Sequence, residues 1–235
     1  MSISRSFWAL RVLVSATLMV LFHSSAQADV SPMRVVLELS EGNRSFVITV
    51  TNPTPTDLPI EMSVVTREVL VDGTQVLEDA SDTFAIFPPL AYIPPGGSQS
   101  VRATYTGSAE LDESRAFILY VKEVPLPPEP GFSGVQFAHN FGVAVYLNTT
   151  TMASGPFAIV DTTGDQFIIS NEGDEFALAT ELEVTTGQGS RRSLQDFLEP
   201  GQNPILPPNA TRRFNLRQGE AIDPDIHRLI APLGR

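Results

Sequence analysis

The sequence contains no cysteine. Disulfides, thiolate metal sites and cysteine nucleophiles are therefore excluded, and a folded domain must depend on its apolar core. The only tryptophan, Trp8, lies near the N-terminus. Trp8 would leave with a cleaved signal peptide, and the lack of any other tryptophan disfavours a carbohydrate-binding or glycosidase-like protein that works through paired carboxylates. Lys122 is the only lysine, so a cationic site is either built from arginine or uses this residue.

Residues 1–28 have the features of a secretory signal peptide. Two arginines precede the apolar run 12–22, and Ala26 and Ala28 form a small-residue cleavage pattern. An uncleaved membrane anchor is the weaker alternative, because the run is shorter than the roughly 20 residues of a spanning helix. We expect export and cleavage, with no membrane span in the mature chain.

The mature chain is acidic. Cleavage after Ala28 leaves 207 of the 235 residues, with 13 basic against 27 acidic side chains. Such a charge balance makes nucleic acid an improbable partner. A chain of this length accommodates one large domain or two domains of about 100 residues each.

Short alternating runs between Pro and Gly residues predict an all-β fold, and no stretch of useful length has a helical period. We expect two immunoglobulin-like sandwiches, at 29–148 and 149–235, joined by the polar stretch around 148–151. The expected strands of the first half are Met33–Leu39, Phe46–Val50, Glu61–Val71, Thr74–Leu77, Phe84–Leu90, Gln99–Tyr105 and Ala116–Val124. Those of the second half are Phe157–Val160, Gln166–Ser170, Phe176–Val184, Ile205–Pro208 and Arg212–Arg217.

The run 135–147 predicts an unusually long strand. Its large apolar side chains and His139 stand at odd positions, whereas its even positions are mostly small or polar. Thirteen residues span roughly 43 Å, well beyond a typical strand. Part of the apolar row is therefore available to a partner, which would gain a strand by edge pairing. The alternative is an ordinary last strand of a sandwich. The Pro- and Gly-rich loop 125–134 feeds this strand.

No arrangement for catalysis or metal binding is visible. The two histidines of the mature chain, His139 and His227, lie in no nucleophile or zinc motif. We expect His139 to pack or to face a partner. The acidic clusters 172–175 and 223–225 are typical of solvated turns rather than of a divalent-ion site. We expect neither an enzyme nor a cofactor.

Three cations are candidates for recognising an anion. Arg34 lies on the polar face of the first expected strand, where its guanidinium fork could receive a carboxylate. The alternative is a surface ion pair with Glu38 or another acid. Lys122 and Arg102 have the same ambiguity.

An ordered series of motifs resembles the PapD-like family, the periplasmic chaperones of chaperone/usher pili. The matching segments are Ser31–Val35, Val50–Asn52, Ile86–Pro89, Ile93–Arg102, Val121–Pro125 and Gly134–Ala138. The resemblance extends from Asp29 to about Leu147, whereas the second half is similar only in its pattern of short strands. It implies two immunoglobulin-like sandwiches in an L, no enzymatic activity and a periplasmic location.

The resemblance also implies roles for particular residues. Such chaperones lend their long strand to pilin subunits that lack a last strand, and they deliver the subunits to an outer-membrane usher. By this resemblance Val135, Phe137 and His139 are donor residues, with Phe141 as a fourth. Arg34 matches the arginine that holds the terminal carboxylate of the subunit.

One departure from the family pattern concerns the second anchor, a lysine late in the long strand. Ala144 stands at its place. Either Lys122 or Arg102 substitutes for this lysine, or the subunit terminus is held differently. The family arginine that resembles Arg102 pairs with acids near the domain interface, so the resemblance implies a structural role for Arg102. The departure suggests a divergent branch. The competing hypothesis is a two-sandwich structural or adhesive surface protein whose long strand is closed by its own neighbours.

Overall fold

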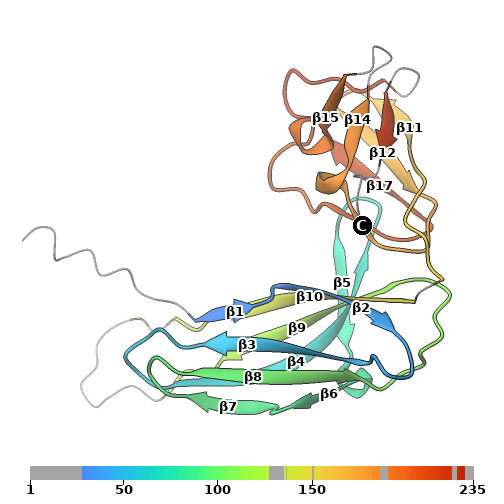
Figure 1. Ribbon diagram of the computed structural model, residues 1–235. Coiled ribbons are helices and arrows are strands. Elements are labelled where there is room, and N and C mark those ends of the chain that lie inside the picture. Colours follow the sequence, from blue (N-terminus) through green and yellow to red (C-terminus); the bar gives the residue numbers. More distant parts are fainter. Residues whose placement is uncertain are drawn as a thin grey trace, which may run out of the picture.

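The computed structural model describes residues 28–126, 135, 137–149, 151–185, 190–223 and 227–230. They form two β-sandwiches set at an angle, which gives the L-shaped outline of Figure 1. Helical structure in this part of the chain consists of the short turns η1 (Ser81–Thr83), η2 (Ala179–Glu181) and η3 (Leu194–Asp196). None of the helices in these ranges is long and apolar enough to cross a membrane. Apart from Ala28, the expected signal peptide lies outside the described residues.

The N-terminal sandwich consists of two sheets. The smaller has the order β1-β3-β8-β6, and the larger has the order β2-β10-β9-β4-β5 with β7 also paired to β4. Their strands are β1 (Asp29–Ser31), β2 (Arg34–Leu39), β3 (Ser45–Thr51), β4 (Leu58–Val69), β5 (Gln75–Asp79), β6 (Phe84–Phe87), β7 (Leu90–Ile93), β8 (Ser98–Tyr105), β9 (Arg115–Glu123) and β10 (Asn140–Thr149).

The beginning of the described chain serves both sheets. β1 pairs antiparallel with β3 in the smaller sheet, and after Pro32 the chain crosses over so that β2 pairs parallel with β10 in the larger one. Alternate residues of the strands fill the space between the sheets, since Ile48, Val101 and Leu147 are fully buried. The crossing therefore places Arg34, the first residue of β2, on the larger sheet.

The C-terminal sandwich is built from shorter strands around a second core. Its strands are β11 (Phe157–Thr163), β12 (Gln166–Asn171), β13 (Ala177–Leu178), β14 (Glu183–Thr185), β15 (Arg191–Ser193), β16 (Ile205–Leu206), β17 (Ala210–Asn215) and β18 (Arg228–Ile230). They form sheets of order β11-β12-β17, β13-β16 and β15-β14-β18. Buried Phe167, Phe214 and Leu194 belong to a cluster separate from the first core.

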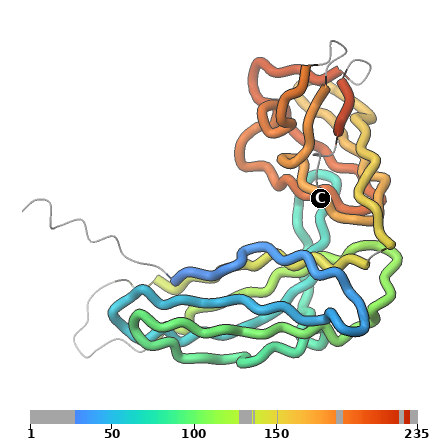
Figure 2. The backbone as a smooth tube through the Cα atoms, in the orientation of Figure 1, coloured from blue at the N-terminus to red at the C-terminus, as the bar shows by residue number. Residues whose placement is uncertain are grey.

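A long hairpin joins the two sandwiches. The β4–β5 turn stands up from the first sandwich and reaches the second, as the cyan segment of Figures 1 and 2 shows. Arg212 of β17 is 1% exposed, and its Nη1 donates to the carbonyls of Leu70 and Val71 at 3.1 and 2.7 Å. Burial lowers the pKa of Arg212. This side chain therefore fastens the hairpin to the second sandwich.

Two further contacts bridge the sandwiches where β10 ends. Asn148 is buried; its side chain accepts from the Ser114 hydroxyl at 2.6 Å and donates to Glu175 at 2.9 Å. The Tyr146 ring lies 5.3 Å from the Phe176 ring, centroid to centroid, and burial raises the pKa of Tyr146. The hydrogen bonds of Asn148 and the contact between the Tyr146 and Phe176 rings thus connect the two sandwiches at the base of the L, where they meet.

The alternation in the sequence predicted most strands correctly, and the all-β class is confirmed. The expected strand Phe176–Val184 is interrupted in the structure: β13 and β14 are separated by η2. The interruption has a local cause, since Ala179 donates its N–H to the carbonyl of Pro204 and Leu182 bonds back to Ala179. The backbone therefore turns where the side-chain pattern suggested a continuous strand.

Candidate functional site: the donor segment and the cleft between the sandwiches

The C-terminal part of the predicted long strand, β10, completes the larger sheet of the first sandwich. β10 pairs with β2 on one side and β9 on the other, and its odd residues Val143, Val145 and Leu147 are at most 1% exposed. Phe141, a predicted donor residue, is partly buried against the same core. In the protein without a partner, Phe141 therefore packs within its own sandwich.

The N-terminal part of the predicted strand differs from the expectation. The regular strand begins at Asn140 instead of Val135. Val135 and residues 137–139 belong to no strand. Val135 is 76% exposed and Phe137 is 80% exposed. Two large apolar side chains are thus held in solvent directly before a strand whose own odd row is buried. We call Val135 and the described residues 137–139 the donor segment.

Glu123, the last residue of β9, ends the ladder between β9 and β10. Its backbone N–H donates to the carbonyl of His139 at 2.9 Å. The His139 N–H donates to the Glu123 carboxylate at 2.9 Å. In a regular antiparallel pair this N–H would donate to the main-chain carbonyl of Glu123 instead. The same carboxylate oxygen lies 2.9 Å from His139 Nδ1. His139, another predicted donor residue, is therefore engaged by Glu123, and the donor segment diverges from β9 at this point.

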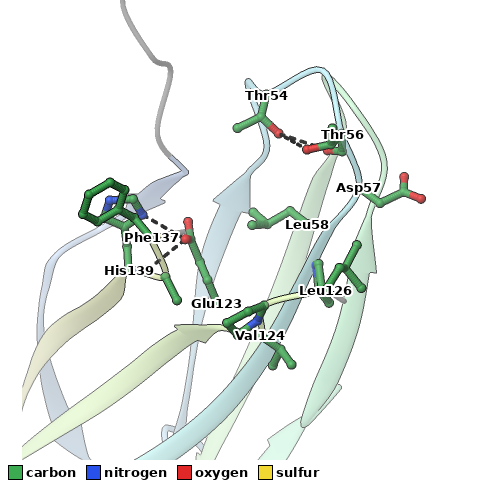
Figure 3. A pocket seen from close by; sticks show the side chains of 12 residues that line it. Thr54, Thr56, Asp57, Leu58, Glu123, Val124, Leu126, Phe137 and His139 are labelled. Carbon is green, nitrogen blue, oxygen red and sulfur yellow. Dashed lines mark hydrogen bonds and ion pairs between the residues drawn. The ribbon is translucent and has the colours of Figure 1, made fainter. Parts of the chain in front are cut away.

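A groove of about 290 Å³ lies beside the donor segment. Its lining includes the apolar side chains of Leu58, Leu126 and Phe137, together with Glu123 and His139. Figure 3 shows His139 joined to Glu123 by dashed lines, with Phe137 next to them at the rim. The groove leaves the donor segment open on this side, so no described neighbour has to be removed for a partner strand to approach Phe137.

The predicted carboxylate anchor lies in the cleft between the two sandwiches. Arg34 is directly opposite Ala144 in the parallel ladder of β2 and β10. Its guanidinium donates from Nη1 to Glu181 Oε1 at 2.6 Å, and it lies 5.9 Å from the centroid of the Tyr146 ring. An ion pair was one of the two sequence-based alternatives for Arg34. The structure provides the acid from the second sandwich, whereas Glu38, on the same strand, forms no ion pair with it.

The other two candidate cations lie away from Arg34. Lys122 is on the larger sheet, opposite Asn140 and Glu61 in the ladders of β9, and its ammonium nitrogen lies 5.9 Å from the Tyr120 ring centroid. Arg102 is exposed on β8, in the smaller sheet, which faces away from the second sandwich (Figure 1). The structure therefore does not bring Arg102 to Arg34, and it places Lys122 four residues along the ladder from the Ala144 position.

The acidic clusters noted in the sequence contribute to folding contacts. Glu175 accepts from Asn148, and Asp174 accepts from Asn209 at 3.3 Å. Asp225 lies outside the described residues. Within the ranges that the structure describes, no group of three or more His, Asp or Glu side chains is placed to hold a metal ion.

Sequence reasoning overlooked Glu123, Glu181 and Arg212. A signal existed for Arg212, because it occupies the same inward parity as buried Phe214 in β17. Glu123 has the same kind of signal, because it continues the inward row of Leu119 and Val121 in β9. Glu181 has none, since its partner Arg34 is 147 residues away. Their roles depend on tertiary geometry.

Comparison with known proteins places this architecture. The model of the family of pili and flagellar-assembly chaperones, PapD N-terminal domain, matches residues 29–146. No curated protein matches the chain in sequence. The chain belongs to the PapD-like family of pilus chaperones, a family of assembly chaperones rather than enzymes. This membership disfavours the alternative of a structural or adhesive surface protein.

Solved structures agree with this assignment. The chain resembles a chain of the CsuC–CsuE chaperone–tip subunit complex of Acinetobacter baumannii, with a TM-score of 0.56 at 15% identity over 81% of this chain and 91% of that one. The Salmonella enterica SafA pilin–SafB chaperone complex gives a TM-score of 0.57 at 20% identity, over 81% of this chain and 84% of that one. The E. coli chaperone DraB gives a TM-score of 0.58 at 17% identity, over 82% of this chain and 86% of that one. At these identities the likeness shows the fold: two immunoglobulin-like sandwiches in an L.

Proposed function

We propose that this protein is a periplasmic chaperone that captures pilin-like subunits by donor-strand complementation and delivers them to an outer-membrane usher. The observation that carries the proposal is the exposure of Val135 and Phe137, at 76% and 80%, immediately before a strand of the core. An unpaired segment with alternate apolar side chains is the form in which one protein adds a strand to another. The two relatives solved as complexes with a pilin or a tip subunit support this class of partner.

In this proposal the donor residues act in two groups. Val135 and Phe137 enter the groove of the subunit, where each apolar side chain contributes about 1.5–3 kcal/mol on burial. His139 and Phe141 form the root of the segment, because Glu123 and the core already hold them. Arg34 receives the terminal carboxylate of the subunit in the cleft. Lys122 is the other candidate cation on the same sheet, and Arg102 has no part in the anchor.

The test is co-expression of the full chain with a pilin-like protein encoded beside its gene, exported to a periplasm. We expect a one-to-one complex with the native chain and none with Phe137→Asp, because a carboxylate would enter an apolar groove. Phe87→Asp is the matched control: Phe87 is 77% exposed on β6 of the smaller sheet, and the variant should retain the complex. Equal loss in both variants would contradict the proposal.

A further inference from the structure

The predicted anchor arginine already holds a carboxylate. Arg34 Nη1 and Glu181 Oε1 are 2.6 Å apart, although the two residues are 147 positions apart in sequence and belong to different sandwiches. The side chains are 36% and 37% exposed. Solvent therefore reaches the pair, and an incoming ligand can compete for it.

The hollow on the inner side of Arg34, away from solvent, is small. The hollow next to its side chain measures about 10 Å³ and is lined by Tyr146 of the first sandwich and by Phe176 and Leu178 of the second, among others. Such a volume is at the lower limit for a single water molecule. A peptide carboxylate with its attached chain does not fit there. It can reach the Glu181 side of the guanidinium only if Glu181 moves away.

The charges in the cleft favour the same conclusion. Arg34 and Glu181 together are neutral, and Ala144, which faces Arg34 in the ladder, adds no cation. Arg67 also acts on the Tyr146 side chain, but its Nε donates to Gln75 of the β4–β5 hairpin. A second carboxylate on Arg34 would lie close to the first, and like charges at this range repel. One carboxylate therefore replaces the other.

We infer that Glu181 is a specificity-determining residue: it occupies Arg34 in the free chaperone and is exchanged for the C-terminal carboxylate of a captured subunit. The inference rests on the proposed function, since it assumes that Arg34 is the anchor. A tethered carboxylate competes at high effective concentration. An isolated acidic peptide therefore binds more weakly, whereas a subunit that also pairs with the donor segment has the additional affinity to replace Glu181.

The exchange has a consequence for the two sandwiches. Glu181 belongs to η2 of the second sandwich, so its departure breaks the Arg34–Glu181 contact across the cleft. The Arg212 bonds to the β4–β5 turn and the Asn148–Glu175 bond remain. Capture of a subunit should thus open the cleft locally at Arg34 while the base of the L stays fastened.

The experiment is a competition for one subunit. A purified complex of the native full chain with its co-expressed pilin-like subunit is mixed with a differently tagged Glu181→Gln chaperone, and the partition of the subunit is measured at equilibrium. We expect the subunit to favour Glu181→Gln about two- to fivefold, the range set by an exposed ion pair. Glu183→Gln is the matched control, because Glu183 pairs with Arg191 at 3.6 Å, away from Arg34. It should show no preference.

Two further arms separate the carboxylate exchange from a general effect on stability. In an Arg34→Ala background, Glu181→Gln should give no gain. With a subunit extended at its C-terminus, which moves the carboxylate from the last strand, the gain should also disappear. Equal partition between native and Glu181→Gln chains, or a gain that persists without Arg34, would overturn the inference while leaving the proposed function intact. Failure of the native chain to form any complex would overturn both.

Discussion

Truncation of Phe137 to alanine should weaken subunit capture about 30-fold without destabilising the free chaperone. Phe137 is 80% exposed, so nearly its whole side chain passes from water into the groove of the subunit on binding. Loss of that burial corresponds to about 2 kcal/mol, which is about 30-fold in the dissociation constant. The free protein loses no core contact, and its free energy of unfolding should change by less than about 0.5 kcal/mol.

The assay for Phe137→Ala is a competition between differently tagged chaperones for one subunit, together with urea unfolding of each free chaperone. Phe87→Ala serves as the control, because Phe87 is equally exposed outside the donor segment. The reasoning would be refuted if Phe137→Ala competed as well as the native chain. It would also be refuted if the variant unfolded at clearly lower urea concentration, because Phe137 would then belong to the core.

Of three further predictions, two concern contacts that hold the two sandwiches together and one concerns an ion pair within the second. Arg212→Leu removes four hydrogen bonds to main-chain carbonyls, of which those of Leu70 and Val71 keep a backbone donor. It should lower the free energy of unfolding by about 2–4 kcal/mol in urea titration, whereas exposed Arg213→Leu should change it little. Asn148→Leu removes the bond to Glu175; we expect a loss of about 1–3 kcal/mol in the same measurement, and an unchanged midpoint would contradict the role of this network. Hydrogen bonds from Arg192 lower the pKa of Glu220 below its ordinary value of 4.5, so its contribution is present above that pH and disappears as the pH falls through the folded-state pKa. The difference in melting temperature between the native chain and Glu220→Gln should therefore shrink between pH 6 and pH 3.

Side-chain alternation predicted most strands of the sandwiches, because one face of most of these strands is buried. The odd row of β10 illustrates this: Val143, Val145 and Leu147 are buried as their parity predicts. The same alternation failed at the front of that strand. Val135 and Phe137 continue the apolar row, but a strand also needs a backbone partner, and the Glu123 carboxylate takes the His139 N–H at this point. Periodicity gives no information on backbone partners.

The contacts across the cleft were the least predictable part of the site. Arg34 was recognised as a candidate anchor, and the general possibility of an ion pair was correct, but Glu181 is 147 residues away and lies in a turn. Its position depends on how the second sandwich is fastened, which in turn depends on Arg212 and the β4–β5 hairpin. No local pattern contains this information.

Hydrogen exchange of the donor segment tests the central claim most directly. In the free chaperone the amides of Val135 and Phe137 should exchange rapidly, because both residues precede the paired strand. In the purified one-to-one complex with a subunit we expect these amides to become strongly protected, with little change at Val101 in the core. Unchanged rapid exchange at both residues in a stable complex would contradict donor-strand complementation.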